Sequence, residues 1–300
     1  MTQTFDLGIV VPLYNKKATV RASVTRLLEQ TVRPAQVVVV DDGSTDESAA
    51  ELAPLEGQCT LIRQTNAGPS AARNRGVAQL RSEWVGFADA DNLWSPDRVG
   101  RVRELLDRRP EIDWLVGSYW ACYPDGKRVT VPPWPGGDGT FSYFERADGL
   151  PGLHCSETLV VRRSLLREVG GFNERLRCYE ITQLYLQLAA RRPTLGFVAE
   201  PTVEVFCDTP SSLYAEKRHS PAVLRAYAEE LLALRSRFAE PPAYLTRLVA
   251  EHFGECVYFA CRRGEYGLAR EVLRERSSWL PVEQRWKARL RCLLGRLRGR

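Results

Sequence analysis

The chain has 300 residues, of which 26% are charged and 44% are hydrophobic, and its formal net charge is +5 at pH 7. This length allows a sizeable core in one or two domains. No apolar run reaches the roughly 18 residues of a membrane-spanning helix, and the first residues lack the basic start and apolar stretch of a signal peptide. The eight cysteines show no C-x-x-C spacing. We therefore expect a cytoplasmic protein with reduced thiols.

The N-terminal part of the chain alternates between short apolar runs and amphipathic segments. Continuous apolar runs are typical of strands that are buried on both faces of a parallel sheet. The expected strands occupy residues 7–12, 36–40, 60–63 and 84–88. Helical spacing of apolar residues predicts helices near 18–30 and 69–80, and Ser44 with Glu47 has the spacing of a capping box that would begin another. This order predicts a parallel sheet with right-handed crossovers.

Polar residues follow three of these strands. Tyr14 comes after the first strand, Asp42 after the second, and Asp89 and Asp91 after the fourth. The carboxyl ends of strands are where open α/β sheets bind ligands. Two carboxylates one residue apart suit a hard cation such as Mg²⁺ or Mn²⁺, which in turn suits phosphate oxygens. Arg73 lies on the expected helix over 69–80. We expect its side chain and the side chains after the strands to converge at one rim of the sheet.

Four segments stand in the order and spacing of a known enzyme family. They read V-V-P-L-Y-N (10–15), V-D-D-G-S-T-D (40–46), N-A-G-P-S-A-A-R-N-R-G (66–76) and D-A-D (89–91). A later segment, G-G-F-N-E-R-L (170–176), is similar to the G-G-F-D-E-x-L segment of the same family. Together they resemble the inverting family-2 glycosyltransferases over about residues 7–212. The resemblance implies an α/β GT-A fold in residues 1–212, with a mostly parallel sheet flanked by helices.

The resemblance also implies a role for each residue at the rim. Pro12 and Tyr14 would form the pocket for a nucleotide base. Asp42 would accept a hydrogen bond from that base, as the imide N–H of uracil offers. Arg73 would lie near the base and the phosphates, and Asp89 would lie beside the ribose. The expected donor is therefore a nucleoside-diphosphate sugar, and a UDP-sugar above others.

A metal ion is part of the same expectation. Asp91 matches the ligand of a Mn²⁺ or Mg²⁺ ion that bridges to the pyrophosphate and offsets the charge on the departing nucleoside diphosphate. The family often has a histidine after its last core strand, and Asp208 stands at about that position here. We therefore predict Asp91 and Asp208 as metal ligands. The expected acceptor is a glycan or a lipid-linked sugar in the synthesis of a cell-envelope polysaccharide.

The expected general base is the point where the chain departs from the family. Inverting transfer needs a base to take the proton of the acceptor hydroxyl. In the resembled family this is usually the Asp of a Glu-Asp pair, and here Glu180 is followed by Ile181. Three alternatives remain open: Glu180 is the base, another carboxylate such as Glu157 reaches in, or the chain is a degenerate relative that binds nucleotide-sugar or a partner without turnover. On a helix, neighbouring side chains point about 100° apart, so Glu180 would need a local shift.

Beyond about residue 212 the pattern becomes helical. Apolar residues at helical spacing predict helices over 222–238, 245–261 and 266–273. We therefore predict a helical C-terminal region over 213–300. It carries no recognised motif, and we expect it to pack on the catalytic domain or to form a homodimer.

The end of this region is strongly basic. Residues 285–300 contain seven Lys or Arg and no acid, so without them 35 basic residues face 37 acidic ones and the net charge changes from +5 to −2. One helical face carries Trp286, Leu290, Leu293, Leu294 and Leu297. A basic amphipathic helix with an aromatic anchor is typical of peripheral binding to the inner face of a membrane. The alternative is a solvated helix at a dimer edge or a frayed terminus.

Other classes of protein fit the sequence less well. A dehydrogenase is disfavoured because no G-x-G-x-x-G follows the first strand. A sugar nucleotidyltransferase would need a glycine-rich, basic phosphate loop at that point, where the chain has P-L-Y-N (12–15). Nucleic acid is disfavoured as a partner because no recognition module accompanies the basic charge.

Overall fold

The computed structural model describes residues 3–134, 136–176, 178–207 and 218–298. The chain divides into two compact units, one of Met1–Glu174 with Leu184–Pro210, and the other of Arg175–Gln183 with Ser211–Arg300. Helix α6 (Glu180–Arg191) therefore begins in the second unit and continues in the first. The segment Arg175–Gln183, which lies within the predicted domain 1–212, groups with the C-terminal helices.

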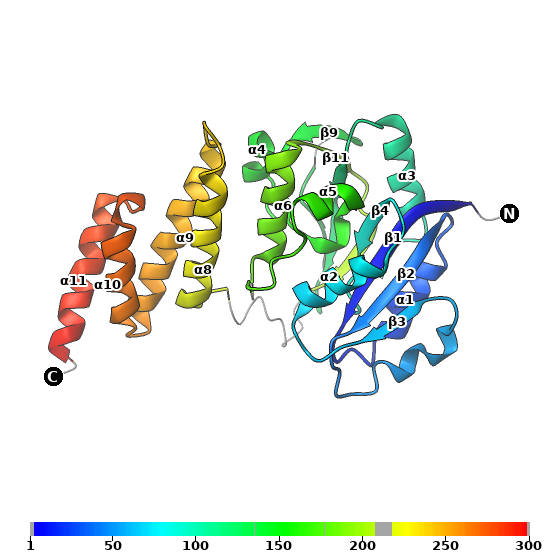
Figure 1. The fold of residues 1–300 in the computed structure, drawn as a ribbon, viewed down its shortest axis with the longest axis horizontal. Helices are drawn as coiled ribbons and strands as arrows, with labels where there is room; N and C mark the ends of the chain where they lie inside the picture. Colours follow the sequence, from blue (N-terminus) through cyan, green and yellow to red (C-terminus); the bar gives the residue numbers. More distant parts are fainter. Residues whose placement is uncertain (1–2, 135, 177, 208–217, 299–300) are drawn as a thin grey trace. The chain divides into compact units, whose positions relative to one another are not determined.

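Within the described residues, the first unit is built on an eight-stranded sheet with the order β3-β2-β1-β4-β10-β6-β11-β9 (Figure 1). Its strands are β1 (Thr4–Leu13), β2 (Arg33–Asp41), β3 (Thr60–Arg63), β4 (Trp84–Phe87), β6 (Trp114–Gly117), β9 (Gly139–Ser142), β10 (Val160–Arg162) and β11 (Thr194–Val198). Strands β3, β2, β1 and β4 pair in parallel, as the sequence predicts. Strand β10 runs antiparallel to both of its neighbours.

Helices cover both faces of the sheet, which is why the strands read as continuous apolar runs. One face of β1, with Ile9 and Val11, packs in a core with helices α1 (Val20–Leu28) and α3 (Arg98–Arg108). On the other face, a Cβ at Gly76 of helix α2 (Pro69–Gln79) would lie 2.3 Å from Val10 Cγ1. The glycine therefore lets α2 lie directly on β1. Shorter helices of this unit are α4 (Tyr143–Arg146), α5 (Arg163–Glu168), η2 (Ala147–Gly149) and η3 (Ser156–Thr158).

The predicted helix start at Ser44 is wrong. The chain makes turns after β2 and then forms the short 3₁₀ helix η1 (Ala50–Leu55). The Ser44 N–H donates to Asp41 Oδ1 (2.9 Å), and the Ser44 hydroxyl accepts from the Asn15 N–H (3.1 Å). Ser44 thus joins the loop after β2 to the loop after β1 instead of capping a helix.

A smaller sheet of the described residues has four strands in the order β5-β12-β7-β8. Its strands are β5 (Leu93–Trp94), β7 (Tyr119–Cys122), β8 (Arg128–Val131) and β12 (Val203–Phe206). Strand β5 follows the D-x-D segment directly, and the Phe206 N–H donates to Asn92 Oδ1 (3.0 Å). This sheet therefore fixes the C-terminal side of the loop that carries Asp89 and Asp91.

The described part of the second unit is helical beyond the start of α6. It contains α8 (Pro221–Arg235), α9 (Ala243–Arg262), α10 (Tyr266–Glu275), η4 (Ser277–Trp279) and α11 (Val282–Arg298). Of the predicted apolar stripe over 222–238, Tyr227, Leu231 and Leu234 are buried, whereas Val223 and Phe238 are half-buried. Leu224, Val249 and Phe253 are also fully buried. Among the described residues, no helix is both long enough and apolar enough to cross a bilayer.

Candidate active site at the rim of the sheet

Parallel pairing brings the carboxyl ends of β1, β2 and β4 to one rim of the sheet. Pro12 lies near the end of β1 and is half-buried, and Tyr14 follows the strand with 46% of its surface exposed. Asp42 follows β2, and Asp89 and Asp91 follow β4. The structure thus places these predicted residues after neighbouring strands of one sheet.

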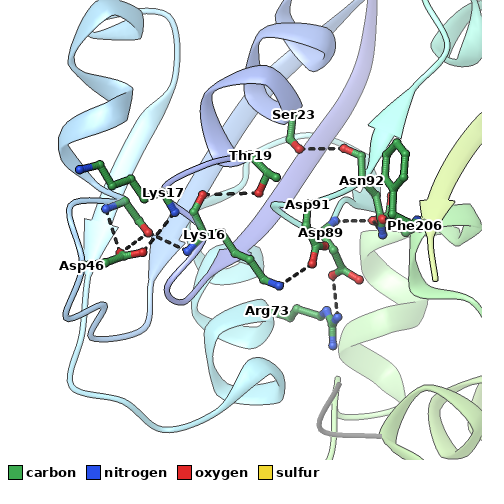
Figure 2. Close-up of polar contacts among 12 residues, drawn as sticks. Lys16, Lys17, Thr19, Ser23, Asp46, Arg73, Asp89, Asp91, Asn92 and Phe206 are labelled. Carbon is green, nitrogen blue, oxygen red and sulfur yellow. Dashed lines mark hydrogen bonds and ion pairs between the residues drawn. The ribbon is translucent and has the colours of Figure 1, made fainter. Parts of the chain in front are cut away.

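Each carboxylate of the D-x-D segment is joined to a cation (Figure 2). Asp89 Oδ1 accepts a hydrogen bond from Arg73 Nη2 at 2.9 Å. Asp91 Oδ2 lies 2.6 Å from Lys16 Nζ. Arg73 comes from α2, whereas Lys16 comes from the loop between β1 and α1. Two cations from different elements therefore meet this short loop.

Arg73 is held in place from several sides. It is buried, with 5% of its surface exposed, and its guanidinium lies 5.3 Å from the centroid of the Phe172 ring. Besides Asp89, Nη2 contacts Ser156 Oγ at 3.4 Å. A charge fixed in this way keeps its position when a ligand arrives, which is the property of a preorganised electrostatic site.

The buried carboxyl group of Glu157 accepts hydrogen bonds from the D-x-D loop and from strand β5. Glu157 is only 1% exposed. Its Oε1 accepts hydrogen bonds from the Asp89 N–H (2.6 Å) and from Asn92 Nδ2 (2.8 Å). Oε2 accepts from Trp94 Nε1 (2.9 Å). Burial, together with the nearby Asp89 carboxylate, raises the pKa of Glu157 to about 8, while the Asn92 and Trp94 hydrogen bonds oppose that shift. Glu157 was predicted as the alternative base, and here both of its oxygens receive donors from the loop and strand β5.

Arg98 supports Glu157 from helix α3. It donates to the Glu157 carbonyl oxygen (2.8 Å) and to Thr202 Oγ1 (2.8 Å), and its guanidinium lies 4.3 Å from the centroid of the Trp94 ring. Burial lowers the pKa of Arg98 to about 10, so it remains a cation at neutral pH. Arg98 thus fixes the backbone of Glu157, and both side chains are buried behind the site.

Asp42 organises the loop that leads into α2. It is buried, and Oδ1 accepts from Gln64 Nε2 (2.7 Å) and from the Ala67 N–H (2.8 Å). Oδ2 accepts from the Gly68 N–H (2.8 Å). An ionised carboxylate has about four lone-pair sites, so it retains room for a further donor such as a base N–H.

The residues at Asp91 fit a divalent cation that arrives with phosphate. Mg²⁺ is usually bound by one or two carboxylates together with water and substrate phosphates. The Asp91 side chain is 24% exposed, so its carboxylate is accessible. Asp208, the other predicted ligand, lies outside the described residues. Among the described residues, no group of three or more His, Cys, Asp or Glu side chains could hold a metal ion.

Glu180 and Ile181 are the first two residues of α6. The preceding Tyr179 has a positive φ of 67° and stacks on Tyr227 with a centroid distance of 4.6 Å. The Tyr179 hydroxyl also donates to the Arg218 carbonyl oxygen (2.9 Å). The start of α6 is therefore fixed within the second unit, and it presents Glu180 at a helix N-terminus, where negative charge is favoured.

Comparison with known protein families decides where the chain belongs. The model described as glycosyl transferase family 2 matches residues 8–170, more than half of the chain. This chain belongs to glycosyl transferase family 2. The family predicted from the four motifs is thereby confirmed.

Several relatives of this family-2 glycosyltransferase come from polysaccharide biosynthesis. The succinoglycan biosynthesis protein ExoW of Rhizobium meliloti (strain 1021) is 30% identical over 220 residues, covering 67% of this chain and 62% of ExoW. ExoU, another succinoglycan biosynthesis protein of that organism, is 36% identical over 196 residues, covering 62% of this chain and 57% of ExoU. The chain therefore spans less than two thirds of the length of either relative.

Solved structures confirm the predicted GT-A fold. The structure of S. aureus TarS 1-349 in complex with UDP-GlcNAc superposes with a TM-score of 0.72 at 18% identity, covering 97% of this chain and 89% of that chain. A mannosyltransferase, PcManGT from Pyrobaculum calidifontis, was solved with GDP-Man and Mn²⁺. It superposes with a TM-score of 0.53 at 17% identity, covering 97% of this chain and 85% of that chain.

Sequence reasoning missed Lys16 and Arg98. Lys16 follows the Tyr14-Asn15 pair, but nothing in a run of two lysines marks which one turns toward the D-x-D loop. Arg98 had a usable signal, because it directly precedes the apolar positions Val99 and Val102 on the buried face of α3. An arginine on a buried helix face requires acceptors inside the protein.

Proposed function

We propose that this family-2 glycosyltransferase moves a sugar from a nucleoside-diphosphate sugar to an acceptor hydroxyl with inversion, assisted by Mn²⁺ or Mg²⁺ at Asp91. The observation that carries the proposal is the D-x-D loop after β4. There Asp89 and Asp91 meet Arg73 and Lys16, and Tyr14 is exposed after the neighbouring strand β1. Fixed cations and accessible carboxylates at the carboxyl rim of a parallel sheet suit a sugar diphosphate.

The nucleotide would occupy the part of the rim formed by β1 and β2. Tyr14 is exposed and able to stack on a base, with Pro12 beside it. Asp42 has capacity for one further donor, which the imide N–H of uracil would supply. Asp89, held by Arg73, would receive the ribose hydroxyls. We therefore propose a UDP-sugar as the donor, a choice that TarS supports by its complex with UDP-GlcNAc.

The reaction would be a single displacement at the anomeric carbon. Glu180 would take the proton of the acceptor hydroxyl as that oxygen attacks, and the bond between the sugar and the diphosphate would break on the opposite face. Arg73 would stabilise charge on the departing diphosphate because it is buried and cannot relax away. A divalent ion bound at Asp91 supplies Lewis-acid stabilisation of the same leaving group. Asp208 would be a second ligand for that ion.

The alternative function is a degenerate family member that binds nucleotide-sugar or acts as a scaffold without turnover. The observation that favours it is Ile181, because isoleucine cannot accept a proton and it occupies the position expected for the family's base. Glu157 is the weaker replacement for Glu180 in our proposal, because its oxygens are engaged by Asp89, Asn92 and Trp94.

For the acceptor we propose a glycan or a lipid-linked sugar of the cell envelope, in line with the names of ExoW and ExoU. Helix α11 supports action in the cytoplasm at the inner face of the membrane. Its exposed face carries Val282, Trp286, Leu290 and Leu293, of which Trp286 is 68% exposed. The opposite side, with Ala288 and Cys292, is buried.

An anionic membrane is the partner that fits this face of α11. Apolar side chains with an aromatic anchor and neighbouring arginines match the boundary between headgroups and acyl chains. A homodimer through the same face is the alternative, and it would bring the basic residues of two copies together. Beyond Glu283 the helix has no acid that could compensate this repulsion.

The donor site is tested by thermal stabilisation with UDP, GDP, dTDP and their sugars, with Mn²⁺ or with a chelator. A ligand at a hundred times its Kd adds about 2.7 kcal/mol to the free energy of unfolding, which is visible in Tm. We expect metal-dependent stabilisation by one nucleotide, lost in Asp91→Ala. The matched control is Asp107→Ala, which removes an exposed carboxylate that is also paired with an arginine. Stabilisation by none of the nucleotides would contradict the proposed function.

A further inference from the structure

The backbone of Lys16 is held by hydrogen bonds, and its side chain extends toward the D-x-D loop. Its N–H donates to Ser48 Oγ (2.7 Å), and its carbonyl oxygen accepts from the Thr19 N–H (3.1 Å) and the Val20 N–H (3.0 Å). The residue before it, Asn15, has a positive φ of 51° and turns the chain out of β1. The main chain of Lys16 is therefore anchored at the start of α1, and only its side chain is able to move.

That side chain spans the rim to the D-x-D loop. Figure 2 shows it extended toward Asp91. The Lys17 N–H donates to Asp46 Oδ2 (3.2 Å), and the Lys17 side chain pairs with Glu47. The Lys16 ammonium lies 2.6 Å from Asp91 Oδ2, and the two side chains are 30% and 24% exposed. The contact joins residues 75 positions apart in sequence, so it is a property of the fold and not of local chain geometry.

An ammonium and a divalent ion compete for the same carboxylate. Both are attracted by the Asp91 charge, and they repel one another across the few ångströms that would separate them. A metal ion that binds Asp91 must therefore either displace the Lys16 ammonium or bind more weakly because of the repulsion between the two cations. The phosphates of a nucleoside diphosphate would give the displaced ammonium a new anionic partner.

Lys16 is suited to such an exchange, whereas Arg73 is not. Lysine is a compact charge on a flexible four-carbon stem, and the Lys16 side chain is partly open to solvent. Arg73 is buried against Phe172 and held by Asp89 and Ser156. Of the two cations on the D-x-D loop, one is fixed and the other is able to change partners.

We propose that Lys16 is a positioning residue that couples metal binding to donor binding. In the donor-free protein its ammonium holds the Asp91 carboxylate and weakens the binding of a divalent ion. When the nucleoside diphosphate binds, the ammonium moves to its phosphates and Asp91 accepts the ion. Metal and donor therefore bind with positive cooperativity, and by linkage each tightens the other by the same factor. This inference rests on the proposed function for its second half, and its first half concerns the protein and the ion alone.

The first experiment measures Mn²⁺ binding to the full chain without nucleotide, by electron paramagnetic resonance of the free ion. Lys16→Met keeps most of the stem and removes the charge. We expect its Kd for Mn²⁺ to be about tenfold lower than that of the wild type, because both a competitor and a like charge are removed. Lys17→Met is the matched control, since Lys17 pairs with Glu47, and it should leave the Kd unchanged. Adding Asp91→Asn to Lys16→Met should abolish the gain.

The second experiment measures the same Kd with saturating UDP. The ratio of the two constants is the coupling factor. We expect it to be large in the wild type and to fall about tenfold in Lys16→Met. Equal Mn²⁺ affinity of the wild type and Lys16→Met without nucleotide, or no binding by either, overturns the role of Lys16 whatever UDP does. Tighter Mn²⁺ binding by Lys16→Met with no response to any nucleotide in any variant would instead overturn the proposed function and the exchange that depends on it.

Discussion

The rim of the first unit and helix α11 of the second unit carry charge in different ways. At the rim of the first unit, carboxylates and cations meet in short pairs, Asp89 with Arg73 and Asp91 with Lys16. On α11 of the second unit, the charges beyond Glu283 are of one sign and accompany exposed apolar side chains. Paired charges prepare a site for a small ligand that carries charges itself, whereas charge of one sign suits an extended surface of the opposite sign. We therefore expect the rim and α11 to bind different partners.

Glu180→Gln gives the largest expected effect and tests whether chemistry is confined to the first unit. If Glu180 is the base, kcat falls about 10³-fold, because general base catalysis typically contributes 10²–10⁴. Stabilisation by nucleotide should be unchanged, because the general base acts on the acceptor hydroxyl and not on the nucleotide. The measurement is sugar transfer to an acceptor at saturating donor.

The control for this prediction moves the carboxylate by one position. Ile181→Asp in the Glu180→Gln background restores the acid at the position where the family usually carries it, and we expect part of the lost rate to return. Full activity of Glu180→Gln would place the base elsewhere. A wild type that binds donor but never transfers sugar would favour the degenerate alternative.

Glu157→Gln tests whether the charges of the first unit are needed to hold its site. An amide must direct its NH₂ toward one of the donors that now face the carboxylate, so we expect a loss of about 2–3 kcal/mol in the free energy of unfolding. The pKa of Glu157 is raised from 4.5 to about 8 in the folded protein. Its contribution to stability is therefore complete below pH 4.5 and is lost as pH rises toward 8.

The difference in stability between wild type and Glu157→Gln should accordingly be widest near pH 5, narrow as the pH rises to about 8 and stay constant above that. Urea denaturation at pH 5, 7 and 9 measures it. The matched control is Glu83→Gln, which alters an exposed glutamate on the same unit that pairs with Arg162. A difference that stays constant with pH would mean that Glu157 is already ionised throughout this range.

Asp42→Asn separates two roles of Asp42: the binding of a nucleotide base, which the family resemblance implies, and the hydrogen bonds to the loop before α2. Asp42 accepts from Gln64, Ala67 and Gly68 in the absence of ligand. We expect the variant to lose about 2 kcal/mol of stability without nucleotide, because an amide NH₂ would face a backbone N–H. Asp6→Asn is the control, since Asp6 is exposed and accepts from the Glu83 N–H. An unchanged Tm without nucleotide, with weaker UDP binding, would restrict Asp42 to base recognition.

Much of the first unit could be predicted from sequence because its signals are local or periodic. The apolar runs of β1, β2 and β4 are continuous since both faces of the sheet are covered, and parallel pairing then brings Asp42 and Asp91 to one rim. The family motifs additionally predicted the GT-A fold and a role for each residue at the rim. The apolar runs and the motifs are both defined by positions along the chain, so they can be identified from the sequence alone.

The remainder of the site depends on contacts that no local pattern encodes. Lys16 meets Asp91, and Glu157 meets the Asp89 N–H, only after the strands are paired. The capping box at Ser44 failed for a related reason, because Asp41 and Asn15 bind the Ser44 groups that a cap would use. Where several partners compete for one polar group, the fold decides between them.

The smallest expected effect concerns α11. Trp286→Ser with Leu290→Ser should weaken binding to vesicles of phosphatidylglycerol and phosphatidylcholine by about tenfold, at unchanged Tm, because both side chains are exposed. Leu61→Ser is the matched control, since it removes an exposed leucine of β3 in the first unit. Binding that requires the anionic lipid and falls with salt supports the electrostatic part of the argument. A wild-type dimer that the double variant converts to a monomer, with no vesicle binding by either, would assign the face to self-association. In that case the one-sign charge of α11 would be tolerated at a protein interface, and the contrast between the two units would no longer imply different partners.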